Sequence, residues 1–136
     1  MKFERLKKNN DFLKVYNKGK SYGCKNLVIY YLPNGTDRFR SGFSVSKKVG
    51  NAVIRNRIRR YLKESLILLE PRDEGHDIIF VARKAAKDNN FFEIKRSVQY
   101  LFRKIGLKVY ENTKQMSDMD HQILSNGDIS DKRTNL

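Results

Sequence analysis

The sequence predicts a single α+β domain in which a small sheet is covered by helices. Segments with the 3.6-residue apolar period of helices alternate along the chain with short β-branched and aromatic runs. The length of 136 residues is normal for one domain. The longest apolar run, Leu27–Leu32, has six residues, whereas a membrane-spanning helix needs about 18. A membrane protein is therefore not expected.

The first part of the chain predicts one helix followed by two strands. Residues 9–11, Asn-Asn-Asp, offer N-caps for a short helix that runs to about Lys18 and ends at Gly19. Leu27–Leu32 is rich in β-branched and aromatic residues and precedes a Pro-Asn-Gly turn, which is typical of a strand. Phe39–Val45 alternates loosely and predicts a second strand, which could pair antiparallel with Leu27–Leu32.

The second part predicts two longer helices around one buried strand. Ala52–Leu69 is the longest helical segment, and a proline follows just beyond its end. Asp77–Arg83 contains the compact apolar run Ile-Ile-Phe-Val, which is typical of a buried strand. Asn90 and Glu93 have capping-box spacing and open a helix that ends at Gly106. The resulting order is α-β-β-α-β-α, with room for one further short strand.

The charge of the chain is large and unevenly placed. The formal net charge is +14, from 29 Lys and Arg against 15 Asp and Glu. Residues 1–110 carry +16 and residues 111–136 carry −2. The latter segment has no aromatic residue and no sustained apolar period, so we expect a folded domain over 1–110 and a disordered or weakly ordered acidic, polar tail over 111–136. So basic a domain predicts a polyanionic partner, most commonly nucleic acid, with an anionic membrane surface or an acidic protein as rivals.

The basic charge is densest between Lys47 and Lys63, where seven of 17 residues are basic and none is acidic. Apolar side chains share one arc of the expected helix, so the arginines fill the opposite arc. Like charges at i,i+4 cost about 0.2–0.5 kcal/mol per pair, which disfavours a merely solvated face. A membrane-surface helix is also disfavoured, because the core needs the apolar arc. The candidate phosphate-binding residues are Lys47, Lys48, Asn51, Arg55, Asn56, Arg57, Arg59, Arg60 and Lys63.

No residue of the chain is predicted to do chemistry. The single cysteine, Cys24, excludes an internal disulfide and a cysteine-rich zinc site, and we expect it to be a small buried hydrophobe. His76 and His121 lie outside the basic segment, and no His, Cys and carboxylate cluster has metal-ligand spacing. The charged N-terminus leads into no apolar segment, so the expected location is the cytoplasm.

Residues 49–63, together with the preceding residues 44–48, resemble the Arg-Asn-Arg motif of the bacterial ribonuclease P protein family, and the resemblance extends over about residues 4–108. It implies the order α-β-β-β-α-β-α and a mainly antiparallel sheet of about four strands, similar to the second domain of a small-subunit ribosomal protein. It also implies a left-handed crossover through the basic helix, although about 98% of crossovers are right-handed.

The resemblance implies an endoribonuclease made of one catalytic RNA and one protein, which hydrolyses a phosphodiester in precursor tRNA and leaves a 5′-phosphate on the mature end. Magnesium would be bound mainly by the RNA, which supplies the catalytic centre. The basic helix would face the catalytic RNA. Positions that match a cleft for the single-stranded 5′ leader are Phe12, Tyr16, Val28 and Tyr30. Without the family, an aromatic pair at i,i+4 such as Phe12 and Tyr16 is equally typical of a core.

Two other functions remain open at this point. A structural RNA-binding protein of ribosomal type would bind folded RNA without depending on a 5′ leader. A helix that reads a DNA major groove would show sequence-specific duplex binding, but the chain has few helix-turn-helix features.

Overall fold

The centre of the molecule is a mixed sheet of five strands in the order β1-β4-β6-β3-β2. The computed structural model describes residues 3–72 and 75–109. The five strands are β1 (Glu4–Arg5), β2 (Lys20–Gly23), β3 (Leu27–Pro33), β4 (Arg40–Ser44) and β6 (His76–Ala82). Two further two-residue strands, β5 (Pro71–Arg72) and β7 (Lys108–Val109), pair with each other outside this sheet.

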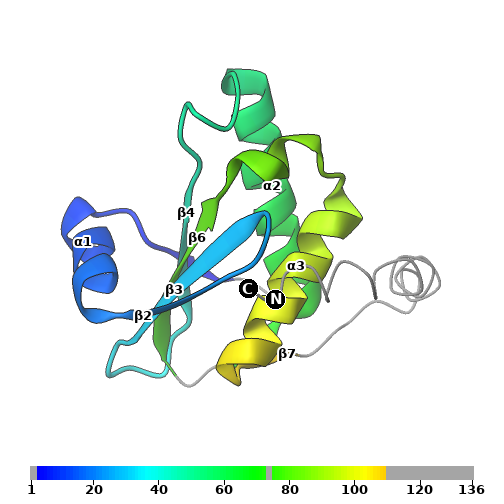
Figure 1. The fold of residues 1–136 in the computed structure, drawn as a ribbon. Helices are drawn as coiled ribbons and strands as arrows, with labels where there is room; N and C mark the ends of the chain where they lie inside the picture. Colours follow the sequence, from blue (N-terminus) through cyan, green and yellow to red (C-terminus); the bar gives the residue numbers. More distant parts are fainter. Residues whose placement is uncertain (1–2, 73–74, 110–136) are drawn as a thin grey trace.

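The helices cover both faces of the sheet. They are α1 (Asn9–Lys18), α2 (Ala52–Leu69) and α3 (Phe91–Ile105), with the short 3-10 helix η1 (Lys84–Asp88) before α3. Figure 1 shows α1 on one side of the sheet and both α2 and α3 on the other. Without the two-residue strands the order is α-β-β-β-α-β-α, and β2 is the additional short strand for which the sequence left room. The α+β class is confirmed.

The predicted helix limits agree closely with the structure where local signals are strong. The helix over 52–69 is confirmed, and so is the capping box of α3. The Asn90 side chain accepts from the Glu93 backbone N–H at 2.8 Å, and the Glu93 side chain accepts from the Asn90 N–H at 2.9 Å. Gly106 ends α3 with φ +82°, a left-handed conformation that glycine adopts without steric cost.

The start of α1 differs from the prediction. Its N-cap position is Lys8, which makes no side-chain capping hydrogen bond, and residues 9–11 already lie in the first turn. Asp11 in that turn still stabilises the helix, because its negative charge interacts favourably with the positive end of the helix dipole. The end of α1 at Gly19 is confirmed. A Cβ there would lie 2.5 Å from the Val15 carbonyl oxygen and 2.6 Å from that of Tyr31, so only glycine fits between α1 and β3.

The predicted antiparallel pairing of Leu27–Leu32 with Phe39–Val45 is wrong, because β6 lies between the two strands. β6 pairs antiparallel with β3 and parallel with β4. β1 is also parallel to β4, so the sheet is mixed rather than mainly antiparallel. β4 and β6 are parallel neighbours joined through α2, which is the crossover that the resemblance implies. The left-handed sense of this crossover stays a prediction.

Two apolar clusters hold the layers together. The larger one lies between the sheet and α2 and α3, and its fully buried members include Leu27, Phe80 and Phe102. The smaller one lies under α1 and is formed by Leu6, Val15 and Ile79, all buried. The predicted division between a domain over 1–110 and a tail over 111–136 stays a prediction, and the tail lies outside the described residues.

Candidate RNA-binding surfaces

Helix α2 is amphipathic as predicted, and its buried side fixes the direction of its cations. Ile58, Leu62, Leu66 and Leu69 are fully buried under the sheet. Asn51 caps the helix, with its side-chain oxygen accepting from the Ile54 N–H at 3.0 Å. Asn51 therefore stabilises the helix start, and its side-chain NH2 group is left to donate to a phosphate.

The predicted phosphate-binding residues all lie on α2 or directly before it, on the sides that the core leaves uncovered. In Figure 1 the first turns of α2 extend beyond the end of the sheet. Half-buried members of the set are Arg55, Arg57 and Arg59, and exposed members are Lys47, Lys48, Asn51, Asn56, Arg60 and Lys63. We call these nine residues the basic surface.

Hydrogen bonds hold two of the arginines toward opposite flanks of α2. The Arg59 guanidinium donates to the Asn56 side chain at 2.9 Å and to the Val45 carbonyl at 3.4 Å, on the β4 side. The Arg57 guanidinium donates to the Lys87 carbonyl at 2.9 Å, on the η1 side. A guanidinium that is already oriented loses less entropy when it binds an anion.

Three of the four predicted leader-binding residues, Phe12, Tyr16 and Tyr30, pack on the smaller apolar cluster beside α1, on the opposite face of the sheet, and Val28 lies further along the same face. The rings of Tyr16 and Tyr30 meet edge to face with centroids 4.9 Å apart, and those of Phe12 and Tyr16 are 6.4 Å apart. Val28 and Tyr30 point to this same face because they are two residues apart on β3. All four are half-buried. We call Phe12, Tyr16, Val28 and Tyr30 the aromatic surface.

Sequence reasoning missed Gly42, which makes room for the Phe12 ring. Gly42 pairs with Ile79 in the register of β4 and β6. A Cβ on Gly42 would lie 2.4 Å from the Phe12 Cζ and 2.9 Å from its Cε2, so the ring rests directly on the backbone of β4. The signal was a glycine inside a strand pattern, which often marks a close approach.

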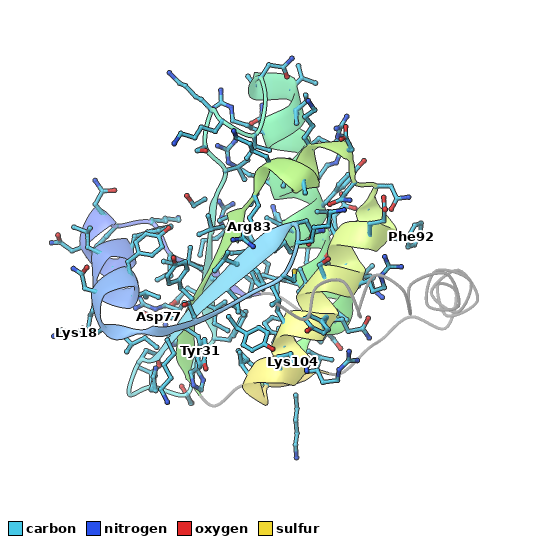
Figure 2. The ribbon with its side chains drawn as sticks, viewed as in Figure 1. Lys18, Tyr31, Asp77, Arg83, Phe92 and Lys104 are labelled. Atoms are coloured by element: carbon cyan, nitrogen blue, oxygen red, sulfur yellow. The ribbon has the colours of Figure 1, made fainter. Side chains whose placement is uncertain are left out.

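Sequence reasoning also missed Arg83, at the far end of the same face. Its guanidinium donates to the Cys24 carbonyl at 2.8 Å and would lie 3.8 Å from a Cβ at Gly23, the register partner of Val28. Figure 2 shows Arg83 between the ends of β3 and β6, well away from α1. The signal was a cation directly after a buried strand.

A buried ion pair supports α1 from below. Asp77 is 4% exposed, and its carboxylate accepts two hydrogen bonds from Arg40, at 2.8 Å from Nε and 2.6 Å from Nη2. Asn34 donates to the same carboxylate at 2.9 Å, and Arg40 Nη1 lies 3.7 Å from the Asp11 carboxylate on α1. The hydrogen bond from Asp77 raises the pKa of Arg40 further above its usual value. Arg40 thus connects β4 and β6 to the helix that carries Phe12 and Tyr16.

The described side chains do not form a metal site. Within residues 3–72 and 75–109, no group of three or more His, Cys, Asp or Glu side chains could hold a metal ion. Cys24 is buried as predicted, its thiol donates to the Asn26 side chain at 3.2 Å, and burial raises its pKa. His121 lies outside the described residues. None of the described helices is long and apolar enough to cross a bilayer.

The chain joins a basic helix, which connects two parallel strands, to aromatic residues on the other face of the sheet. The family model described as Ribonuclease P matches residues 1–106. The chain belongs to the ribonuclease P protein family. The resemblance carried by the motif at residues 49–63 is therefore confirmed.

Relatives and solved structures agree with this membership. The chain is 47% identical to the ribonuclease P protein component of Clostridioides difficile over 106 residues, which cover 76% of this chain and 93% of the relative. It is 45% identical to that of Listeria monocytogenes, over 75% of this chain and 87% of the relative.

Two solved members of the ribonuclease P family share the fold. The Staphylococcus aureus RNase P protein superposes with a TM-score of 0.68 at 38% identity, over 76% of this chain and 96% of that chain. The Thermotoga maritima RNase P protein superposes with a TM-score of 0.66 at 28% identity, over 74% of this chain and 96% of that chain.

Proposed function

We propose that this chain is the protein subunit of a ribonucleoprotein that removes the 5′ leader from precursor tRNA. The family is that of the protein component of ribonuclease P, the tRNA 5′-processing endoribonuclease whose catalysis resides in its RNA. The observation that carries the proposal is that two RNA-compatible surfaces lie on opposite faces of one sheet. One protein can therefore hold two RNA segments at the same time. The proposed site of action is the cytoplasm.

The basic surface would bind the catalytic RNA. Its arginines and lysines offer charge and donors to phosphates, and phosphate contacts set position without reading sequence. The half-buried Arg57 and Arg59 are anchored by carbonyl and amide oxygens, so they present their remaining N–H groups in fixed directions. Affinity for RNA should therefore fall steeply as salt concentration rises.

The aromatic surface would bind the single-stranded 5′ leader. Stacking of a base on an aromatic ring contributes about 1–3 kcal/mol and tolerates every base. The half-buried rings of Phe12, Tyr16 and Tyr30 keep one another in place through edge-to-face contacts. Such tolerance suits an enzyme that acts on many different leaders.

In this proposal one protein joins one catalytic RNA, and the protein contributes binding rather than chemistry. Magnesium ions would be bound mainly by the RNA through its phosphates. Hydrolysis leaves a 5′-phosphate on the mature tRNA. The protein positions the precursor and neutralises phosphates near the reacting bond, which lowers the magnesium concentration that the RNA requires.

Reconstitution with a bacterial ribonuclease P RNA tests the function. At low magnesium, the full chain should raise the rate of leader cleavage well above that of the RNA alone, and the gain should grow with leader length. Absence of any gain contradicts the proposal. Tight binding to folded RNA without dependence on a leader would instead indicate a structural RNA-binding protein.

Arg60→Ala should weaken binding of the catalytic RNA and flatten its salt dependence. Arg60 is an exposed arginine of α2, and loss of one phosphate contact should reduce the slope of log K against log salt by about 0.7–0.9. Filter binding at several salt concentrations gives the slope. The matched control is Arg38→Ala, which removes an arginine that is 69% exposed outside α2 and should leave the slope unchanged. Equal slopes for wild type and Arg60→Ala would remove Arg60 from the basic surface.

A further inference from the structure

Three aromatic rings form a second chain of contacts where α2 meets the start of α3. Tyr61 on α2 meets Phe91 edge to face with centroids 5.9 Å apart, and Phe91 meets Phe92 in the same manner at 5.2 Å. All three residues are half-buried. They lie on the opposite side of the sheet from the aromatic surface beside α1. We call Tyr61, Phe91 and Phe92 the ring chain.

Two of these rings are not used by the core. Among the described residues, the set that packs against either apolar cluster includes Tyr61 but neither Phe91 nor Phe92. The core side of α3 is supplied by other residues, such as Ile94, Val98 and Leu101. Figure 2 shows Phe92 at the outer edge of the molecule, beside the start of α3 and pointing away from the sheet. Two phenylalanines therefore stay at the surface although the core does not require them.

The ring chain is held rigidly. The reciprocal hydrogen bonds of Asn90 and Glu93 fix the first turn of α3, which carries both phenylalanines. The Arg57 guanidinium, bonded to the Lys87 carbonyl, ties α2 to the segment that precedes this turn. Rings in fixed positions can accept a base with little loss of entropy.

Cations of the basic surface border the ring chain directly. The Arg60 guanidinium lies 5.4 Å from the centre of the Tyr61 ring, and Lys87 is exposed nearby on η1. Two of the neighbouring carboxylates already have partners: Glu64 lies 3.5 Å from Arg60, and Glu93 belongs to the capping box. Asp88 is the remaining exposed acid of η1. Positive charge beside aromatic rings that are partly open to solvent is the pattern by which single-stranded nucleic acid is bound.

We propose that the ring chain is a stacking site for an unpaired base of the catalytic RNA, with Phe92 as the outermost platform. This inference rests on the proposed function, because it takes α2 to lie against that RNA. Phosphates bound by Arg57 and Arg60 bring the neighbouring nucleotides over the rings. The leader is not the occupant, since its proposed surface lies across the sheet. An unpaired base fits because an RNA helix keeps its bases stacked inside.

Phe92→Ala in the full chain tests the site. We expect the affinity for ribonuclease P RNA to fall about 5- to 160-fold, the range that loss of one stacked base gives. The slope of log K against log salt should stay that of wild type, because phenylalanine releases no counterions. Phe92→Trp, which keeps an aromatic face, should restore binding. The matched control is Ile67→Ala, which truncates an apolar residue of α2 that is 39% exposed and belongs neither to the basic surface nor to the ring chain, and it should bind as wild type.

The outcomes separate the two proposals. If wild type neither binds the RNA nor stimulates cleavage, the proposed function fails. If wild type does both and Phe92→Ala binds equally well with an unchanged melting temperature, only the stacking site is overturned. An equal loss for Ile67→Ala would also overturn it. Loss of self-association in Phe92→Ala, seen by sedimentation without a change in RNA affinity, would assign the rings to a second copy of the chain instead.

Discussion

Arg40→Met is expected to lower the free energy of unfolding by about 3 kcal/mol, because it leaves the Asp77 carboxylate buried without its counter-charge. Removing one partner of a buried pair costs about 3–5 kcal/mol. The lower end applies here, since the Arg40 side chain is 28% exposed and water can partly replace it. Asn34 still donates to Asp77, but one neutral donor does not compensate a full charge. Urea denaturation followed by circular dichroism measures the change.

The matched control is Arg38→Met, two residues earlier on the same segment. Arg38 pairs with Glu4 at 3.0 Å, but both side chains are largely exposed, at 69% and 44%. Exposed pairs contribute about 0–1 kcal/mol. A loss of 3 kcal/mol in both variants, or in neither, would show that burial of Asp77 is not the cause. The loss in the free energy of unfolding for Arg40→Lys should lie between those of the other two variants. Lysine keeps the positive charge but cannot make both hydrogen bonds to the carboxylate.

Tyr30→Ala is expected to weaken binding of precursor tRNA by the reconstituted enzyme about 5- to 160-fold and to leave binding of mature tRNA unchanged. Loss of one stacked base has an effect of this size. Tyr30 also supports the ring of Tyr16 at 4.9 Å, so its removal disturbs a second platform. Phe12→Ala should act in the same direction. Binding constants for the two RNAs, measured in parallel, give the comparison.

A control on the same helix is Leu13→Ala. Leu13 follows Phe12 on α1 but is 53% exposed and does not belong to the aromatic surface. Binding of both RNAs should therefore stay at the wild-type level. Tyr30→Phe, which keeps the ring, should bind the precursor nearly as well as wild type. Equal losses for precursor and mature tRNA in Tyr30→Ala would exclude this surface as the place of the leader.

The sequence predicted the helices well because their signals are local. The apolar arc of 52–69, the capping box of Asn90 and Glu93, and the glycine at 106 each act within one or two turns. The N-cap of α1 was predicted wrongly because its local signal is ambiguous. Three consecutive polar residues could each cap the helix, and the structure begins it one residue before all of them, at Lys8.

Strand pairing could not be predicted in the same way, because it depends on distant segments. Leu27–Leu32 and Phe39–Val45 are neighbours in the chain, and a hairpin is the simplest arrangement of such strands. The structure instead places residues 76–82 between them. The strongly apolar run at 78–81 requires two strand neighbours and burial on both faces, which only the central position supplies.

The binding residues were found from the motif and the resemblance, whereas their supports were not. The basic surface stands out as an acid-free run, and the four residues of the aromatic surface came from matched family positions. Arg40 and Phe92 carry no signal of their own, and the glycine inside the strand pattern at position 42 does not indicate which residue lies on it. Gly42 matters because Phe12, 30 residues away, lies on it, and Arg40 matters because Asp77 is buried beneath it. Such roles exist only after the chain has folded.

The central place of β6 makes the order of synthesis important. α1, β2, β3 and β4 leave the ribosome first, but β3 and β4 have no strand between them until residues 76–82 follow. Closing that gap requires a long loop containing all of α2, which costs entropy before any contact is gained. This one strand contributes Ile79 to the apolar cluster under the aromatic surface, and Ile78 and Phe80 to the cluster under the basic surface. A nascent chain that ends before residue 76 therefore lacks the strand on which both RNA-facing surfaces rest.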